Sequence, residues 1–89
     1  MKKHIFIEGR VQGVGFRHFT RKNAEALGVT GWVQNLPDDR VEAVFQGDEE
    51  QVNELIEKCK EGPAASYVKE IKAEVDSSSD VFKDFSVRM

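Results

Sequence analysis

Residues 9–17 have the sequence GRVQGVGFR, and this stretch is the most informative segment of the chain. An apolar segment typical of a strand precedes it, and a segment typical of a helix follows it. Three glycines within seven positions allow a sharp turn and let a ligand approach the main chain closely. Such a turn can gather main-chain N–H groups into an anion site, and the N-terminus of a helix adds partial positive charge. The stretch therefore predicts a site for a phosphate or a carboxylate.

Positive charge gathers around the same stretch. The chain has a formal net charge of −3, yet no acidic residue lies between positions 9 and 24. The basic residues and the histidine in that segment are Arg10, Arg17, His18, Arg21 and Lys22. Arg17 stands where the helix begins and is expected to face the anion. The other three basic residues fit either the site or a solvated helix face. The negative net charge argues against a general nucleic-acid binder.

Length and composition predict one small domain that spans residues 1–89. Hydrophobic residues make up 39% of the chain and charged residues 33%, as in ordinary globular domains. No apolar run approaches the ~18 residues that a membrane helix needs. The apolar segment 5–7 is too short for a signal peptide. The single cysteine cannot form an internal disulfide, so a reducing compartment is expected, most simply the cytoplasm.

Helical and alternating apolar patterns predict seven elements. Strands are expected at 4–8, 30–35, 40–46, 68–75 and 82–88, and helices at 17–27 and from Asp48 to a stop at Gly62. Asp48 and Gln51 resemble a capping box. The order is β-α-β-β-α-β with a short additional C-terminal strand. It predicts an α+β, ferredoxin-like split-βαβ fold, in which both helices cover one face of a mostly antiparallel sheet.

Each predicted element has a face suited to a shared core. In the first helix this face consists of Phe16, Phe19, Thr20, Asn23 and Leu27, and in the second of Val52, Leu55, Ile56 and Cys59. The strand at 68–75 is expected to point Ile71, Ala73 and Val75 inward, and the last strand Phe85 and Val87. Because this fold hosts many unrelated functions, the function has to be argued from the site.

The glycine-rich stretch does not match two common nucleotide-binding patterns. A dinucleotide-binding fingerprint, G-x-G-x-x-G, needs a third glycine where His18 stands. A Walker A loop ends in Gly-Lys-Ser/Thr, which this stretch lacks. A glycine-rich turn alone is a weak indication of function. A second segment, GWVQN at residues 31–35, makes the indication specific.

Together, the two segments resemble the signatures of the acylphosphatase family. The first signature is matched at Ile7, Gly9, Val11, Gln12, Gly13, Val14, Phe16 and Arg17. The second begins with residues 31–35 and continues to Val41 and Gly47. The resemblance spans essentially the whole chain. One departure is Asp39, where the family has a glycine in the turn between the second and third strands. Aspartate tolerates left-handed geometry better than most residues.

The resemblance implies hydrolysis of the mixed anhydride between a carboxylic acid and phosphoric acid. The expected substrate is a small-molecule acyl phosphate. Inorganic phosphate is expected as a product and as a competitive inhibitor. No metal ion or cofactor is expected, because His4 and His18 have no cysteine or carboxylate partners at ligand spacing. A monomer without nucleic-acid or membrane partners is sufficient for this chemistry.

Two side chains are expected to carry the reaction. Arg17 offers a planar fork of donors that matches two phosphate oxygens and stays charged. The remaining oxygens are expected to bind main-chain N–H groups of the loop formed by Gln12, Gly13, Val14, Gly15, Phe16 and Arg17. Asn35 both donates and accepts, so it can orient a water for in-line attack on phosphorus. Neither side chain is a base, so the water proton is expected to pass to a phosphate oxygen of the substrate.

Other residues have more ordinary explanations. His18 follows Arg17 directly and is expected on another side of the helix, at ~100° per residue. Cys59 lies on an apolar helix face, which favours a buried structural thiol over a nucleophile. The pair Asp38 and Asp39 is expected in a solvated turn.

Three rival functions follow from the same pattern. An RNA-binding module would place stacking aromatic residues on exposed central strands, but the third predicted strand offers only Phe45, on the core side. An accessory domain of a larger carbamoyl-transfer maturation protein would also carry these signatures. A phosphate-binding protein without turnover would not need Asn35.

Overall fold

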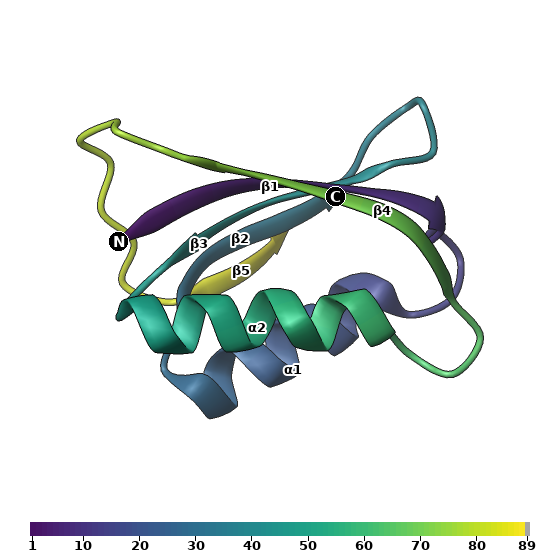
Figure 1. The fold of residues 1–89 in the computed structure, drawn as a ribbon, viewed down its shortest axis with the longest axis horizontal. Helices are drawn as coiled ribbons and strands as arrows, with labels where there is room; N and C mark the ends of the chain where they lie inside the picture. The colour runs from purple at the N-terminus through teal and green to yellow at the C-terminus, as the bar shows by residue number, and fades with distance from the viewer. Residues whose placement is uncertain (89) are drawn as a thin grey trace.

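A computed structural model describes residues 1–88 of the chain (Figure 1). The elements follow the order β1 (Lys2–Arg10), α1 (Phe16–Leu27), β2 (Thr30–Asn35), β3 (Val41–Gln46), α2 (Glu49–Glu61), β4 (Tyr67–Val75) and β5 (Phe85–Arg88). This is the predicted order. β2 has the predicted bounds, β1 extends beyond both predicted ends, and β5 is shorter than predicted.

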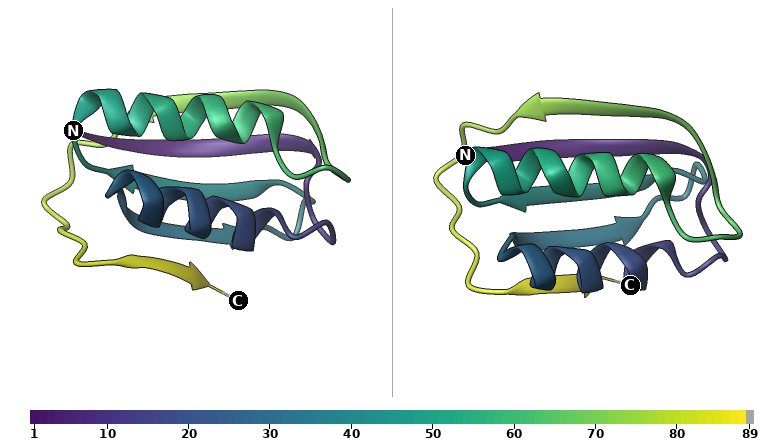
Figure 2. Two further views of the ribbon diagram at one scale, coloured as in Figure 1. Left: turned by 90° about the horizontal axis from the view of Figure 1, so that it is seen from below. Right: turned by 60° about the horizontal axis from the view of Figure 1, so that its bottom comes forward.

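The five strands form one sheet in the order β4-β1-β3-β2-β5. Neighbouring strands are antiparallel, except that β2 and β5 are parallel. Both helices cover the same face of the sheet, with α1 against β2 and β5 and α2 on the β4 side (Figure 2). The α+β, ferredoxin-like architecture expected from the sequence is therefore confirmed.

The core fills the space between the sheet and the helices. α2 buries Val52, Leu55, Ile56 and Cys59, as their spacing predicted. α1 buries Phe16, Thr20 and Ala24, whereas Phe19, Asn23 and Leu27 are only partly buried. Thr20 is polar, but its Oγ1 donates to the main-chain oxygen of Phe16 at 2.8 Å. That bond satisfies the buried hydroxyl, so Thr20 fits the core without an unpaired donor.

The prediction of inward-facing residues on β4 is only partly correct. Ile71 packs against the core, but Ala73 and Val75 are exposed, Val75 by 73%. β4 lies at the edge of the sheet and has β1 as its only neighbour. Most of its side chains are therefore exposed to solvent, although apolar and polar residues alternate along the strand. In β5, Phe85 is buried and Val87 partly buried, as expected.

The predicted capping box at the start of α2 is wrong. Asp48 is the N-cap residue, but its side chain makes no capping hydrogen bond. Glu49 and Glu50 occupy the first turn, so carboxylates already stabilise the positive end of the helix dipole without a specific bond. At the start of the helix, the main-chain N–H of Val52 donates to the main-chain oxygen of Asp48 at 2.9 Å.

Because of their directions, three strands end on the same side of the sheet. β3 is antiparallel to both β1 and β2, and β5 is parallel to β2. β1, β2 and β5 therefore run the same way, and their ends at Arg10, Asn35 and Arg88 lie at the same edge. Ile7 and Asn35 both pair with Val41 of β3. This register places Asn35 level with the last part of β1, close to where the glycine-rich loop begins.

The turn between β2 and β3 contains the residue that departs from the family signature. Asp39 has a φ of 74°, and within residues 1–88 it is the only residue other than glycine with a positive φ. Asp39 therefore adopts the left-handed backbone conformation that a glycine would adopt at this position. A side chain in the left-handed region costs about 1 kcal/mol, less for aspartate than for most residues.

We expect Asp39→Gly to stabilise the protein by up to about 1 kcal/mol, because glycine adopts a positive φ without a Cβ clash. In a domain of this size, that change raises Tm by roughly 4–8 °C. Thermal unfolding followed by circular dichroism measures it.

Asp38→Gly is the matched control in the same turn. The Asp38 carboxylate accepts hydrogen bonds from the Arg40 main-chain N–H at 3.2 Å and from Arg40 Nε at 2.8 Å. The control should therefore lower Tm. An Asp39→Gly variant with unchanged or lower Tm would show that the turn is not strained at this position.

Candidate active site

The loop between β1 and α1 takes a shape that its glycines permit. Gly13 and Gly15 have φ angles of 73° and 78°, in the left-handed region where side chains are strained. A Cβ at either position would meet no atom within 4 Å. The backbone conformation, and not crowding, therefore requires glycine here. Gly15 is also the N-cap of α1, and it brings no side chain to cap the first turn.

The main-chain N–H groups of this loop are left without partners in the rest of the main chain. Within residues 1–88, none of the N–H groups at positions 12–15 donates to another main-chain group. The first N–H groups of any α-helix also lack intrahelical acceptors. The first turn of α1 contains no acidic residue that would offset its partial positive charge. The loop and the helix start together therefore have an arrangement that is able to bind an anion.

Gln12 fastens the loop to the neighbouring turn. Its side-chain Nε2 donates to the main-chain oxygens of Leu36 at 2.8 Å and Arg40 at 2.9 Å. These two oxygens flank the turn between β2 and β3, so one side chain couples the loop to the segment that follows Asn35. The side chain of Gln12 therefore helps to hold the loop in place. Val14, also predicted as part of the site, packs against the core.

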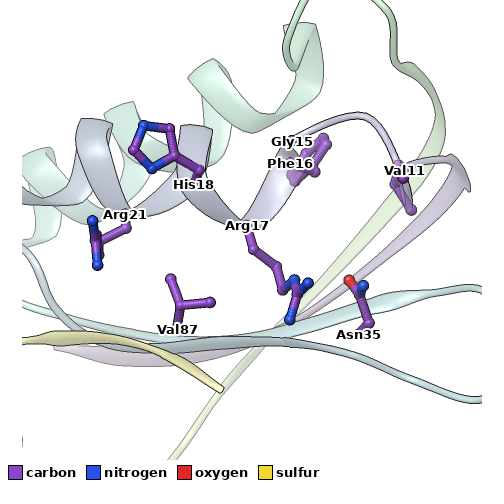
Figure 3. Close-up of a pocket in the computed structure, with 9 residues that line it drawn as sticks. Val11, Gly15, Phe16, Arg17, His18, Arg21, Asn35 and Val87 are labelled. Atoms are coloured by element: carbon purple, nitrogen blue, oxygen red, sulfur yellow. The ribbon is translucent and has the colours of Figure 1, made fainter. Parts of the chain in front are cut away.

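A pocket of about 310 Å³ opens where these segments meet (Figure 3). It is lined by Val11, Gly13, Gly15, Phe16, Arg17, His18, Arg21, Asn35 and Val87. The structure therefore brings together Arg17, Asn35 and three further residues of the predicted loop. Gln12 and Val14 are not among the lining residues.

Arg17 lies in the first turn of α1, and its side chain reaches toward β5. One guanidinium nitrogen, Nη1, donates to the main-chain oxygen of Arg88 at 3.0 Å. This bond holds the guanidinium across the gap between helix and strand. In Figure 3 the group points toward the side chain of Asn35.

Asn35 is the last residue of β2, and its amide faces the pocket (Figure 3). Its side-chain oxygen, Oδ1, is buried and has no hydrogen-bond partner within residues 1–88. A buried acceptor without a donor costs free energy, and native proteins seldom retain one without a reason. An acceptor aimed at a pocket can take a hydrogen bond from a bound water or ligand.

The lining residues named above include no carboxylate and no cysteine, so His18 is the only side chain among them of a type that commonly serves as a base. In Figure 3 His18 projects from α1 away from Arg17 and Asn35. Cys59 lies in the core, where burial raises the pKa of its thiol to about 12. At neutral pH Cys59 is therefore a protonated, inaccessible thiol, as its sequence position suggested.

Two lining residues have roles that the sequence left open or did not indicate. The sequence left open whether Arg21 lies in the site or on a solvated helix face. Its spacing of four residues from Arg17 was the sequence feature that favoured the site, because residues four apart share one face of a helix. Val87 was expected to face the core, and it also forms one wall of the pocket. Nothing local to β5 shows that its end lies beside the start of α1.

Residues 1–88 contain no cluster of three or more histidine, cysteine, aspartate or glutamate side chains placed to hold a metal ion. Neither α1 nor α2 has the length and apolar character that crossing a bilayer requires.

Comparison with known sequences gives a consistent result. A sequence model of the acylphosphatase family matches residues 3–87. An acylphosphatase from Rubrobacter xylanophilus is 50% identical over 84 residues, which cover 94% of this chain and 76% of that protein.

Two solved structures share the fold over almost its whole length. The acylphosphatase from Bacillus subtilis is 35% identical, with a TM-score of 0.95, and the match covers 99% of this chain and 98% of that one. An acylphosphatase from Coxiella burnetii is 40% identical, with a TM-score of 0.92, over 98% of this chain and 90% of that one.

Proposed function

The chain belongs to the acylphosphatase family, and we propose that the pocket between β1, α1 and β2 is where it hydrolyses acyl phosphates. One observation carries this assignment. The guanidinium of Arg17 and the buried Oδ1 of Asn35 line the same pocket, next to the loop at positions 12–15. Within residues 1–88, that Oδ1 has no hydrogen-bond partner, and the main-chain N–H groups of the loop have no main-chain acceptor. That combination can hold a phosphate and orient a water beside it.

The phosphate group binds the loop in this proposal. Main-chain N–H groups from Gln12 to Arg17 donate to its oxygens, and Arg17 donates from two guanidinium nitrogens. Phosphoryl transfer requires little covalent chemistry from a protein, so positioning and charge stabilisation supply most of the rate enhancement. Arg17 neutralises charge that spreads over the phosphoryl oxygens in the transition state.

Asn35 positions the attacking water. Its Oδ1 accepts a hydrogen bond from the water, which turns a lone pair of the water oxygen toward phosphorus. As the new O–P bond forms, the bond between phosphorus and the acyl oxygen breaks. The carboxylate leaves with the bonding pair, and the phosphoryl group becomes inorganic phosphate.

The substrate itself takes the proton of the attacking water. Arg17 and Asn35 are not bases at neutral pH, and His18 projects away from both. A phosphate oxygen of the substrate is therefore the acceptor. The carboxylate is a good leaving group and does not need protonation by an acid. The reaction proceeds in this scheme without a metal ion or a cofactor.

The setting of the enzyme follows from the same proposal. Residues 1–89 form one acylphosphatase domain that acts as a monomer, since every group used in the scheme comes from a single chain. A cytoplasmic location agrees with a lone cysteine that is buried and unpaired.

We expect replacements of the two side chains to have different kinetic signatures. Arg17→Ala should lower kcat/KM by roughly 10²–10³-fold or more, because both binding and transition-state stabilisation are lost. Asn35→Ala should lower kcat by about 10²-fold with little change in KM, because Asn35 orients water and not substrate. Steady-state hydrolysis of benzoyl phosphate measures both.

Gln34→Ala is the matched control for Asn35. Gln34 precedes Asn35 in β2, and its Nε2 donates to Glu42 at 2.7 Å on the opposite face of the sheet. This variant should keep near wild-type kinetics. Full turnover by Asn35→Ala would eliminate the water-positioning role.

Inorganic phosphate should inhibit benzoyl phosphate hydrolysis competitively, because it occupies the same loop. Initial rates at several phosphate concentrations should show a rise in apparent KM at constant kcat. Incubation with EDTA should leave the rate unchanged. Inhibition that lowers kcat alone, or activity that EDTA removes and a divalent metal restores, would contradict the scheme.

A further inference from the structure

The pocket offers more room and more positive charge than a phosphate group needs. Its volume of about 310 Å³ equals the share of roughly ten waters at about 30 Å³ each. A phosphate has four oxygens. The remaining space is available to the acyl part of a substrate, and Arg21 lines it as a second guanidinium.

Arg21 and Arg17 are adjacent on one face of α1. Residues four apart in a helix have Cβ atoms about 5–6 Å from each other, one turn along the axis. Figure 3 shows both side chains on the side of α1 that faces Val87 of β5. An anion bound to Arg17 therefore has Arg21 about one helical turn away.

The direction of the reaction points the acyl part toward Arg21. In an in-line displacement the water and the leaving group lie on opposite sides of phosphorus. Asn35, which orients the water, lies on one side of Arg17, and Arg21 lies on the other (Figure 3). Water attack from the Asn35 side therefore places the leaving carboxylate along Val87, with Arg21 beyond it.

The charge of Arg21 is not used inside the described part of the protein. The ion pairs within residues 1–88 join His4 to Glu42, Arg40 to Asp38 and Lys60 to Glu57. Arg21 is absent from them and from the side-chain hydrogen bonds of these residues, although its side chain is half-buried. A half-buried guanidinium beside a pocket can pair with an anionic ligand.

We propose that Arg21 is a specificity residue, which makes this enzyme prefer acyl phosphates whose acyl part carries a second negatively charged group about one helical turn from the phosphate. The proposal rests on the acyl phosphate hydrolysis assigned above. A guanidinium binds a carboxylate or a phosphate equally well in geometry, so the shared feature is the second anion.

A matched pair of substrates tests the preference. Benzoyl phosphate and 3-carboxybenzoyl phosphate differ by one carboxylate, and the rigid ring keeps that carboxylate away from the reacting centre. We expect the wild-type enzyme to show a kcat/KM roughly threefold to tenfold higher for the carboxylated substrate, as for one partly screened charge pair. Added KCl should reduce the preference, because salt screens it.

Variants at position 21 separate specificity from general catalysis. Arg21→Gln should abolish the preference, because kcat/KM should fall further for 3-carboxybenzoyl phosphate than for benzoyl phosphate, and Arg21→Glu should invert the preference. Arg21→Lys should retain most of it, since the charge remains. Lys22→Gln is the control, because it removes the same charge from the next, exposed residue, which does not line the pocket.

Each unfavourable outcome has its own meaning. Equal wild-type kcat/KM for the two substrates, or an equal fall for both in Arg21→Gln, overturns the specificity role while hydrolysis stands. The same loss of preference in Lys22→Gln overturns it as well, because the preference then depends on the overall positive charge of α1 and not on Arg21. No hydrolysis of either substrate by the wild-type protein overturns the proposed function itself.

Discussion

The rest of the site depends on main-chain N–H groups at the junction of β1 and α1 that have no main-chain acceptor within residues 1–88. Positions 12–15 form a loop rather than a strand or helix, so their N–H groups remain available. Two glycines in left-handed conformations make that shape accessible. Gln12 holds the shape by binding the turn between β2 and β3. A phosphate would complete the hydrogen bonding that the fold leaves open.

The topology of the sheet supplies the side chains around this loop. Because β1, β2 and β5 run the same way, one edge of the sheet collects the loop, Asn35 and the end of β5. The helix adds Arg17 and, one turn later, Arg21. In the proposed scheme Asn35 of β2 orients the water, while Arg17 and Arg21, one turn apart on α1, meet the phosphate and the acyl part. Under the proposed scheme, a substitution at Arg21 alters substrate preference and leaves the loop in place.

The features that sequence predicted correctly have local causes. The spacing of Val52, Leu55, Ile56 and Cys59 is enough to define one buried face of α2, and the glycines are enough to locate the loop. The exposure of Val75 depends on the order of strands in the sheet, which no local pattern contains. The place of Arg21 depends on β5, which lies more than sixty residues away in the chain. The signatures pointed to Asn35, but only the structure shows its unpaired oxygen beside Arg17.

Titration of the ¹⁵N-labelled protein with inorganic phosphate tests the central claim most directly, because it detects the anion at individual N–H groups. The largest saturable shifts should occur at the main-chain amides of residues 12–17, accompanied by a shift of the Arg17 side-chain Nε–H. Amides of β4 should not move. Saturable shifts concentrated elsewhere, or none at residues 12–17 at phosphate concentrations that inhibit the enzyme, would contradict the assignment of the anion site.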